Sequence, residues 1–277
     1  MIATRSIAAP LAGVALVAAG CGSSNKGGTT AGSSVPATPS KAAPAMASAN
    51  TGARLSVVAP KAGAVVHGNS VPFDVGISNF KVDCRVAGTP DRQGVGHYHV
   101  ELDGALINMF CTNRDRVSLQ NVKPGAHTLT FLAATNDHTD DMKSARKVKF
   151  TYQPTKALPA IKGEQKGKPS ITILSPKPGA TVHRAFDLTV KPKNFEFSCA
   201  LYGKQDIAGY GHWHINVDST TKGMMGMGTM LGMSCARSFH VSLAGIKPGA
   251  HTFFAILEDD QHAPTPHAQA AVKLNVR

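Results

Sequence analysis

Gly-Val-Gly-His-Tyr-His-Val-Glu-Leu-Asp, residues 94–103, returns as Gly-Tyr-Gly-His-Trp-His-Ile-Asn-Val-Asp at residues 209–218. A second block, residues 117–128, returns at residues 241–252, and both copies of it end in Lys-Pro-Gly-Ala-His-Thr. A repeat period of about 115 residues is too long for a solenoid and has the length of a whole domain. The sequence therefore predicts a tandem duplication of one domain.

Short alternating segments make up each copy, and Pro, Gly and Asn separate them without any stretch of helical period. The strands expected are 54–58, 71–77, 97–103, 105–110, 117–122, 126–134 and 146–152, then 170–174, 185–191, 212–218, 229–234, 241–246, 250–257 and 269–276. About seven short strands in about 100 residues predict an all-β, immunoglobulin-like sandwich. The Pro-Gly-Ala-His step resembles the corner of that fold, with His127 and His251 in place of a tyrosine whose ring bonds back to the backbone.

Residues 1–20 resemble the signal peptide of a bacterial lipoprotein. Arg5 supplies the positive start, an apolar run follows that is too short to span a bilayer, and the segment ends in Leu-Val-Ala-Ala-Gly-Cys. The resemblance implies that Cys21 becomes a lipidated N-terminus, which would anchor the protein outside the cytoplasm on the bacterial cell membrane. An ordinary secretory signal with an incidental cysteine is the alternative.

The rest of the chain divides by composition. Residues 21–52 hold the cysteine and a segment of small residues that is typical of a flexible tether. The first domain is expected at 53–154, a basic linker with Pro and Gly at 155–168, and the second domain at 169–277.

Four cysteines remain besides Cys21, two in each copy at matching positions. This arrangement predicts two structural disulfides in an oxidising compartment, Cys84 with Cys111 and Cys199 with Cys235. A zinc site would need closer pairs such as Cys-x-x-Cys, which the sequence does not contain.

The formal net charge of +12 is spread along the chain and gathers on no segment, so the footprint of a nucleic-acid-binding protein is missing. An envelope protein or an anionic polymer is the partner that this charge favours. The sequence has no Gly-x-Ser-x-Gly, His-Glu-x-x-His or phosphate-loop motif, so we expect no enzyme. The paired aspartates 140–141 and 259–260 fit turns.

Alternation along the repeated strand places Tyr98, Val100 and Leu102 on one face, with His97 and His99 on the other. Trp213, Ile215 and Val217 likewise oppose His212 and His214 in the second copy. We expect the apolar sets in the core and the histidine pairs facing away from it.

Three interpretations of the histidine pairs stay open. They bond to a covering loop or to Asp103 and Asp218, they bind a metal ion, or they form a recognition surface. Residues i and i+2 on a strand lie about 7 Å apart, which lets two imidazoles share an ion. His138 and His262, each in the loop after a strand, are expected to close over the same face if the strand order permits.

The second copy carries about nine extra residues, 219–227, in a glycine-interrupted stretch that is rich in methionine. Thioethers are soft ligands that favour Cu(I), so copper is a candidate cofactor. A mobile apolar loop that contacts a partner is the alternative. The methionines concerned are Met224, Met225, Met227, Met230 and Met233.

The Gly-His-x-His-x-x-x-Asp strand and the Pro-Gly-x-His-Thr step resemble uncharacterised immunoglobulin-like domains of bacterial extracytoplasmic proteins, which implies location and fold. The methionine-rich segment is similar in composition to periplasmic copper carriers of β-sandwich fold. The function expected is a membrane-anchored lipoprotein that binds or scaffolds, with metal binding as the specific hypothesis. A structural or partner-binding envelope protein without metal is the main alternative, and a metal-dependent hydrolase the least favoured one.

Overall fold

The computed structural model describes residues 48–277, apart from the side chains of Met224 and Met225. The predicted signal peptide, Cys21 and all but the end of the predicted tether lie outside the described residues. The described residues belong to one compact unit. In residues 48–277, no helix is long and apolar enough to cross a membrane.

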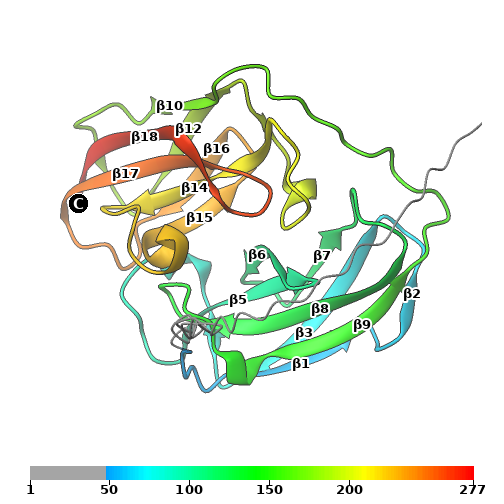
Figure 1. Cartoon of the computed structure of the whole chain (residues 1–277). Coiled ribbons are helices and arrows are strands. Elements are labelled where there is room, and N and C mark those ends of the chain that lie inside the picture. The colour runs from blue at the N-terminus through cyan, green and yellow to red at the C-terminus, as the bar shows by residue number, and fades with distance from the viewer. Residues whose placement is uncertain (1–47) are drawn as a thin grey trace, which may run out of the picture. The chain divides into compact units, whose positions relative to one another are not determined.

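The first repeat is built from two layers, an antiparallel sheet and a mixed sheet, that Figure 1 shows in blue to green. One sheet has the order β1-β3-β7, and the other has the order β2-β9-β8-β5-β4, with β6 paired to β5. The strands are β1 (Arg54–Ala59), β2 (Ala64–Val66), β3 (Ser70–Ser78), β4 (Lys81–Val82), β5 (Val95–Leu102), β6 (Ala105–Phe110), β7 (Arg114–Ser118), β8 (Gly125–Ala134) and β9 (Arg146–Tyr152).

The second repeat has the same topology strand for strand. Its sheets have the orders β10-β12-β16 and β11-β18-β17-β14-β13, with β15 paired to β14. The strands are β10 (Ser170–Ser175), β11 (Thr181–Val182), β12 (Ala185–Lys193), β13 (Glu196–Phe197), β14 (Tyr210–Val217), β15 (Met230–Ser234), β16 (Ser238–Ser242), β17 (Gly249–Glu258) and β18 (Pro264–Val276). The prediction of two tandem immunoglobulin-like sandwiches is therefore confirmed.

Aromatic side chains fill both cores at equivalent places. Tyr98 of β5 is fully buried and donates its hydroxyl to the carbonyl of Thr112 at 2.6 Å. Trp213 of β14 is also fully buried, and its indole N–H donates to Ala236 at 2.8 Å. Each large ring therefore packs its apolar body in the core while its polar group is satisfied by backbone.

Two disulfides link the sheets to short helical turns. Cys84, in the 3-10 turn Cys84–Val86 after β4, bonds to Cys111 at the end of β6. Cys199, in the matching turn Cys199–Leu201, bonds to Cys235 after β15. These are the pairs that the sequence predicts, so each disulfide stays within one repeat.

A histidine forms the corner of each sandwich, as the sequence predicts. His127 Nε2 lies 2.8 Å from the carbonyl of Lys123, and its Nδ1 lies 2.6 Å from Asp103. His251 repeats both contacts, with Lys247 at 2.8 Å and Asp218 at 2.6 Å. The two aspartates thus hold the corner histidines, so of the structural interpretation of the His-x-His pairs only the bonds to a covering loop remain.

One strand in each repeat ends earlier than the alternation predicts. The expected strand 117–122 is β7, which pairs with β3 only as far as Ser118. Val122 N–H then donates to Leu119 at 3.1 Å, so these residues turn out of the sheet. Leu119 is still buried, because it closes the end of the core from the turn. Alternation in the sequence therefore continues past the last strand hydrogen bond.

Candidate metal centre

Three histidines meet in the first repeat because of its strand order. His97 and His99 lie on β5, and β8 is the antiparallel neighbour of β5, with His97 opposite Ala134 at the end of β8. The loop that leaves β8 therefore begins beside His97. His138 stands in this loop at φ +64°, in a turn where its N–H donates to Thr135 at 3.0 Å.

The second repeat brings its own three histidines together in the same way. His212 and His214 lie on β14, next to β17, and His262 follows β17 at φ +64°. The expectation that His138 and His262 close over the histidine pairs is therefore confirmed. We call these sets the first triad (His97, His99, His138) and the second triad (His212, His214, His262).

The ring nitrogens of each triad converge on one point. In the first triad, Nε2 of His99 lies 3.0 Å from Nε2 of His97 and 3.5 Å from Nδ1 of His138. In the second triad the three distances between ring nitrogens are 3.0, 3.0 and 3.4 Å. All six side chains are buried. Four-coordinate metal–imidazole bonds of about 2.05 Å place nitrogens about 3.3 Å apart, so the observed spacing fits a metal ion.

Hydrogen bonds on the outer side of the rings decide which nitrogens carry protons. His99 Nδ1 lies 2.7 Å from the Asp140 carboxylate, and His138 Nε2 lies 2.8 Å from the carbonyl of Met230. Both partners only accept, so each neutral ring has its proton on the outside and a bare lone pair inside. Two lone pairs facing each other repel, and a cation between them removes the repulsion. Outer hydrogen bonds of this kind are typical of histidines that ligate metals.

Burial favours the neutral form of five of these histidines. It lowers the pKa of His97 well below its ordinary value, with further lowering by His138 and His99. Burial also lowers the pKa of His138 to about 4. In the second triad, burial lowers the pKa of His262 to about 4 and those of His212 and His214 well below the ordinary value. Neutral imidazole is the form that binds metal, so these sites are ready to coordinate at neutral pH.

The two triads differ in their surroundings. His214 Nδ1 faces Glu258 at 3.6 Å, where His99 has Asp140 at 2.7 Å. Burial raises the pKa of Glu258 to about 9, so this carboxyl is neutral at pH 7. The ring of Tyr202 packs on His212 with 4.5 Å between centroids. The second triad is therefore set in a more apolar and less charged pocket than the first.

The aspartates that were expected to form turns include one that supports the site. Asp140 does lie in a loop, but its carboxylate accepts the bond from His99. The sequence offers no repeat signal for this role, because the residue two places after His262 is Pro264. Glu258, Tyr202 and the carbonyls that hold His138 and His262 were missed for the same reason, since none of them belongs to a repeated motif.

The methionine-rich segment packs against the first repeat. Met227, Met230 and Met233 are buried in the apolar cluster that contains the core of the first repeat. Met224–Thr229 forms a 3-10 turn that is tied to β14 by the bond from Asn216 Nδ2 to Gly226, at 2.7 Å. These contacts favour the apolar-surface alternative, with the first repeat as the surface contacted. Of this segment, Met227 also lines a cavity of about 250 Å³ together with His99 and His262.

Replacing Asp140 with asparagine should weaken metal binding at the first triad by roughly 10- to 100-fold, because outer partners of ligating histidines set ring orientation and basicity. Competitive titration of the full chain with a chelator measures this. Asp187→Asn is the matched control, since Asp187 accepts a similar bond at 2.8 Å from His240, an exposed histidine. Equal affinity in the two variants would contradict the role given to Asp140.

Comparisons with known proteins leave the activity open. No family model matches the chain, and no curated protein matches it. Similar solved structures include the fibronectin(III)-like modules of Clostridium thermocellum CbhA, with 14% identity over 80% of this chain and 94% of that chain and a TM-score of 0.25. The four N-terminal Ig domains of Dscam1 isoform 6.9 share 11% identity over 81% of this chain and 46% of that chain, with a TM-score of 0.22.

The FN1–FN3 domains of chicken CNTN1 share 10% identity over 80% of this chain and 63% of that chain, with a TM-score of 0.23. TM-scores this low carry no argument, so the fold rests on the strand pairing described above. What fold and site define together is a class: an all-β protein of two immunoglobulin-like repeats, each with a buried triad of histidines that could hold a metal ion.

Proposed function

We propose that the chain is a metal-binding lipoprotein of the bacterial cell envelope, in which each repeat holds one transition-metal ion on its three histidines. The observation that carries the proposal is the convergence of three buried histidines in each repeat, with neighbouring ring nitrogens 3.0–3.5 Å apart. Three imidazoles leave one position of a four-coordinate ion open for water or another ligand.

Copper and zinc are the metals that fit. Imidazole suits both ions, and the chain has no cysteine in either triad that would favour a softer site. Met230 and Met233 are buried in the apolar cluster of the first repeat, but Met227, whose thioether would favour Cu(I), shares a cavity wall with His99 and His262. We therefore place copper first and zinc second.

Location outside the cytoplasm supports the same function. The lipobox-like sequence that ends at Cys21 gives the anchor, and two disulfides within the repeats fit an oxidising compartment. Labelling with a fatty acid tests this part, because Cys21→Ala should abolish the label. A labelled Cys21→Ala protein in the membrane fraction would refute the lipoprotein assignment.

The decisive experiment is titration of the full chain with Cu(I), Cu(II) and Zn(II) against competing chelators of known affinity. We expect two ions per chain, and X-ray absorption spectra with nitrogen neighbours at about 2.0 Å. The double variant His97→Ala/His212→Ala should bind neither ion, while His67→Ala/His240→Ala, which changes two histidines outside the triads, should bind both. If the unaltered chain binds none of the three ions, the proposal is wrong, and a structural or partner-binding role in the cell envelope becomes the favoured function.

A further inference from the structure

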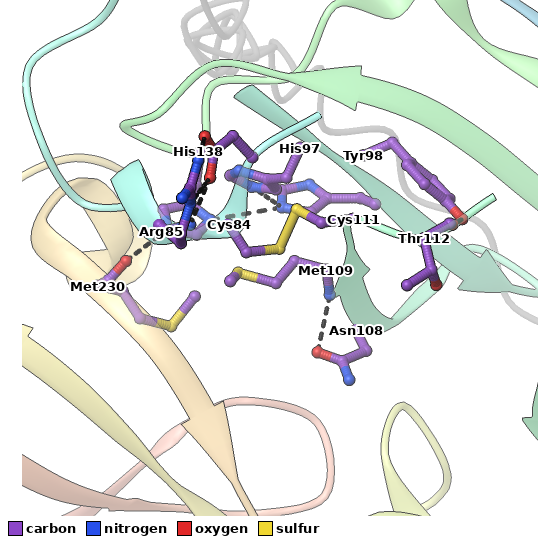
Figure 2. The surroundings of a disulfide bond; sticks show 12 residues. Cys84, Arg85, His97, Tyr98, Asn108, Met109, Cys111, Thr112, His138 and Met230 are labelled. Carbon is purple, nitrogen blue, oxygen red and sulfur yellow. Dashed lines mark hydrogen bonds and ion pairs between the residues drawn. A yellow bond between two sulfur atoms is a disulfide. The ribbon is translucent and has the colours of Figure 1, made fainter. Parts of the chain in front are cut away.

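Each triad donates one hydrogen bond to the other repeat. His138, in the first repeat, bonds through Nε2 to the carbonyl of Met230 in the second repeat, at 2.8 Å. His262, in the second repeat, bonds through Nε2 to the carbonyl of Leu106 in the first repeat, at 2.9 Å. Figure 2 shows the bond from His138 to Met230 beside the Cys84–Cys111 disulfide.

The two contacts are equivalent by position. Leu106 lies in β6 and Met230 in β15, and these are the edge strands that pair with β5 and β14. A glycine turn supports each contact. Gly88 N–H donates to Asn136, two residues before His138, and Gly203 N–H donates to Asp260, two residues before His262, at 2.6 and 2.7 Å.

These glycines also touch the opposite repeat. A Cβ atom added to Gly88 would lie 2.7 Å from the backbone of Met230, and one added to Gly203 would meet the carbonyl of Leu106. Both glycines have positive φ angles, +71° and +63°. In each repeat, the loop that carries the third histidine and the glycine turn therefore meet the edge strand of the other repeat at one place.

We propose that each triad depends on a hydrogen bond across the interface between the two repeats. The two triads therefore bind metal cooperatively. This rests on the proposed function. The carbonyls of Met230 and Leu106 act as positioning groups, because each fixes the proton of the third histidine on its outer nitrogen and leaves the inner nitrogen bare. An ion that holds this ring in place strengthens the same contact.

Cooperativity follows because both centres depend on one interface. Filling the first triad stabilises the docked arrangement of the repeats, and the second triad needs that arrangement to hold His262 in its binding orientation. Coupling of this kind typically changes the affinity of the second event by about 5- to 150-fold. No covalent step is involved, and the ligand is the metal ion itself.

Zn²⁺ titration of the full chain against a chelator, with the bound state of each triad followed by the NMR signals of its histidines, tests the proposal. We expect the second ion to bind about tenfold more tightly than the first. Two independent sites, each with an affinity that does not change when the other is filled, would overturn the coupling while leaving the proposed function intact. Absence of Zn²⁺ and copper binding would overturn both.

Gly88→Ala should weaken binding at both triads and remove the cooperativity, because the added methyl group separates the repeats at the Met230 contact. Gly63→Ala is the matched control. Gly63 also has a positive φ angle, +77°, but nothing lies within 4 Å of an added Cβ, so the backbone strain is similar without a contact between repeats. A loss confined to the first triad would contradict the proposal.

His97→Ala keeps the test decisive if Gly88→Ala does not fold. It removes a ligand of the first triad and leaves the His138 and His262 contacts in place. The second triad should then bind Zn²⁺ about tenfold more weakly than it does in the filled unaltered chain. Unchanged affinity of the second triad would show that the two centres are independent.

Discussion

Replacing His99 with alanine should lower the metal content of the chain from two ions to one. His99 is the central ligand of the first triad, since its Nε2 lies within 3.5 Å of a ring nitrogen of both His97 and His138. Loss of an outer partner alone costs roughly 10- to 100-fold in metal affinity, and we expect loss of a ligand to cost at least about 100-fold. Metal analysis after gel filtration, followed by chelator competition, measures both quantities.

The control for this variant is His240→Ala. His240 is an exposed histidine that bonds to Asp187 and belongs to neither triad. Two ions should remain in His240→Ala, and the ion of the second triad should remain in His99→Ala. Two ions in His99→Ala at unchanged affinity would mean that the convergence of the first triad has no role in binding.

The metal-free protein should be most stable near pH 6.5 and should lose stability steeply as the pH falls from 6.5 towards 4. Burial lowers the pKa of His138 and of His262 to about 4, while unfolded histidine titrates near 6.5. Between pH 4 and 6.5 these histidines are protonated in the unfolded state and neutral in the folded state. Lowering the pH therefore favours unfolding. Each such histidine contributes about 1.4 kcal/mol per pH unit within that window.

Other buried groups change the size of this effect. Burial also lowers the pKa of His97, His212 and His214, so they act in the same direction. Burial raises the pKa of Glu258 to about 9 and that of Asp260 to about 7, so these carboxyls stabilise the fold at low pH and oppose the histidines. Five histidines outweigh two carboxyls below pH 6.5. Above it, Glu258 continues to act, and stability should decline up to about pH 8; from there Lys204, whose pKa burial lowers to about 8, acts in the opposite direction and offsets the decline.

Urea unfolding of the metal-free chain at several pH values measures this profile. His138→Gln removes one titrating group, so its unfolding free energy should depend on pH less steeply by about 1.4 kcal/mol per unit between pH 4 and 6.5. His240→Gln, which changes an exposed histidine, should follow the unaltered chain. A flat profile over this range would contradict the buried, neutral state of the triads.

Alternation and repetition in the sequence were enough to predict most of the fold. The faces of β5 and β14 follow from the period of two, and Tyr98 and Trp213 are buried in the cores as expected. The third member of each triad was predictable only as a condition on strand order, because the loop after β8 reaches His97 only if β8 lies beside β5.

Burial of the triads could not be predicted from the sequence. Alternation shows that His97 and His99 point away from the core of their own repeat, and a side chain in that position is ordinarily exposed. What covers them includes the 3-10 turns, the histidine loops and the backbone of the other repeat, at Met230 and Leu106. Contacts between repeats leave no periodic pattern in a sequence, so the carbonyls of Met230 and Leu106 could not be predicted. Asp140 could not be predicted either, because its position is not repeated in the second copy.

The reciprocal contacts from His138 to Met230 and from His262 to Leu106 have the form of an isologous interface, in which each half offers the other the same surface. Two separate copies would associate through such a surface only at sufficient concentration. The segment between Tyr152 and Ser170 joins them in one chain, and a short linker raises the effective concentration of one half around the other to roughly millimolar. Association of the two halves is therefore independent of dilution, and each half is free to change its sequence separately, as the pocket of Glu258 and Tyr202 in the second half illustrates.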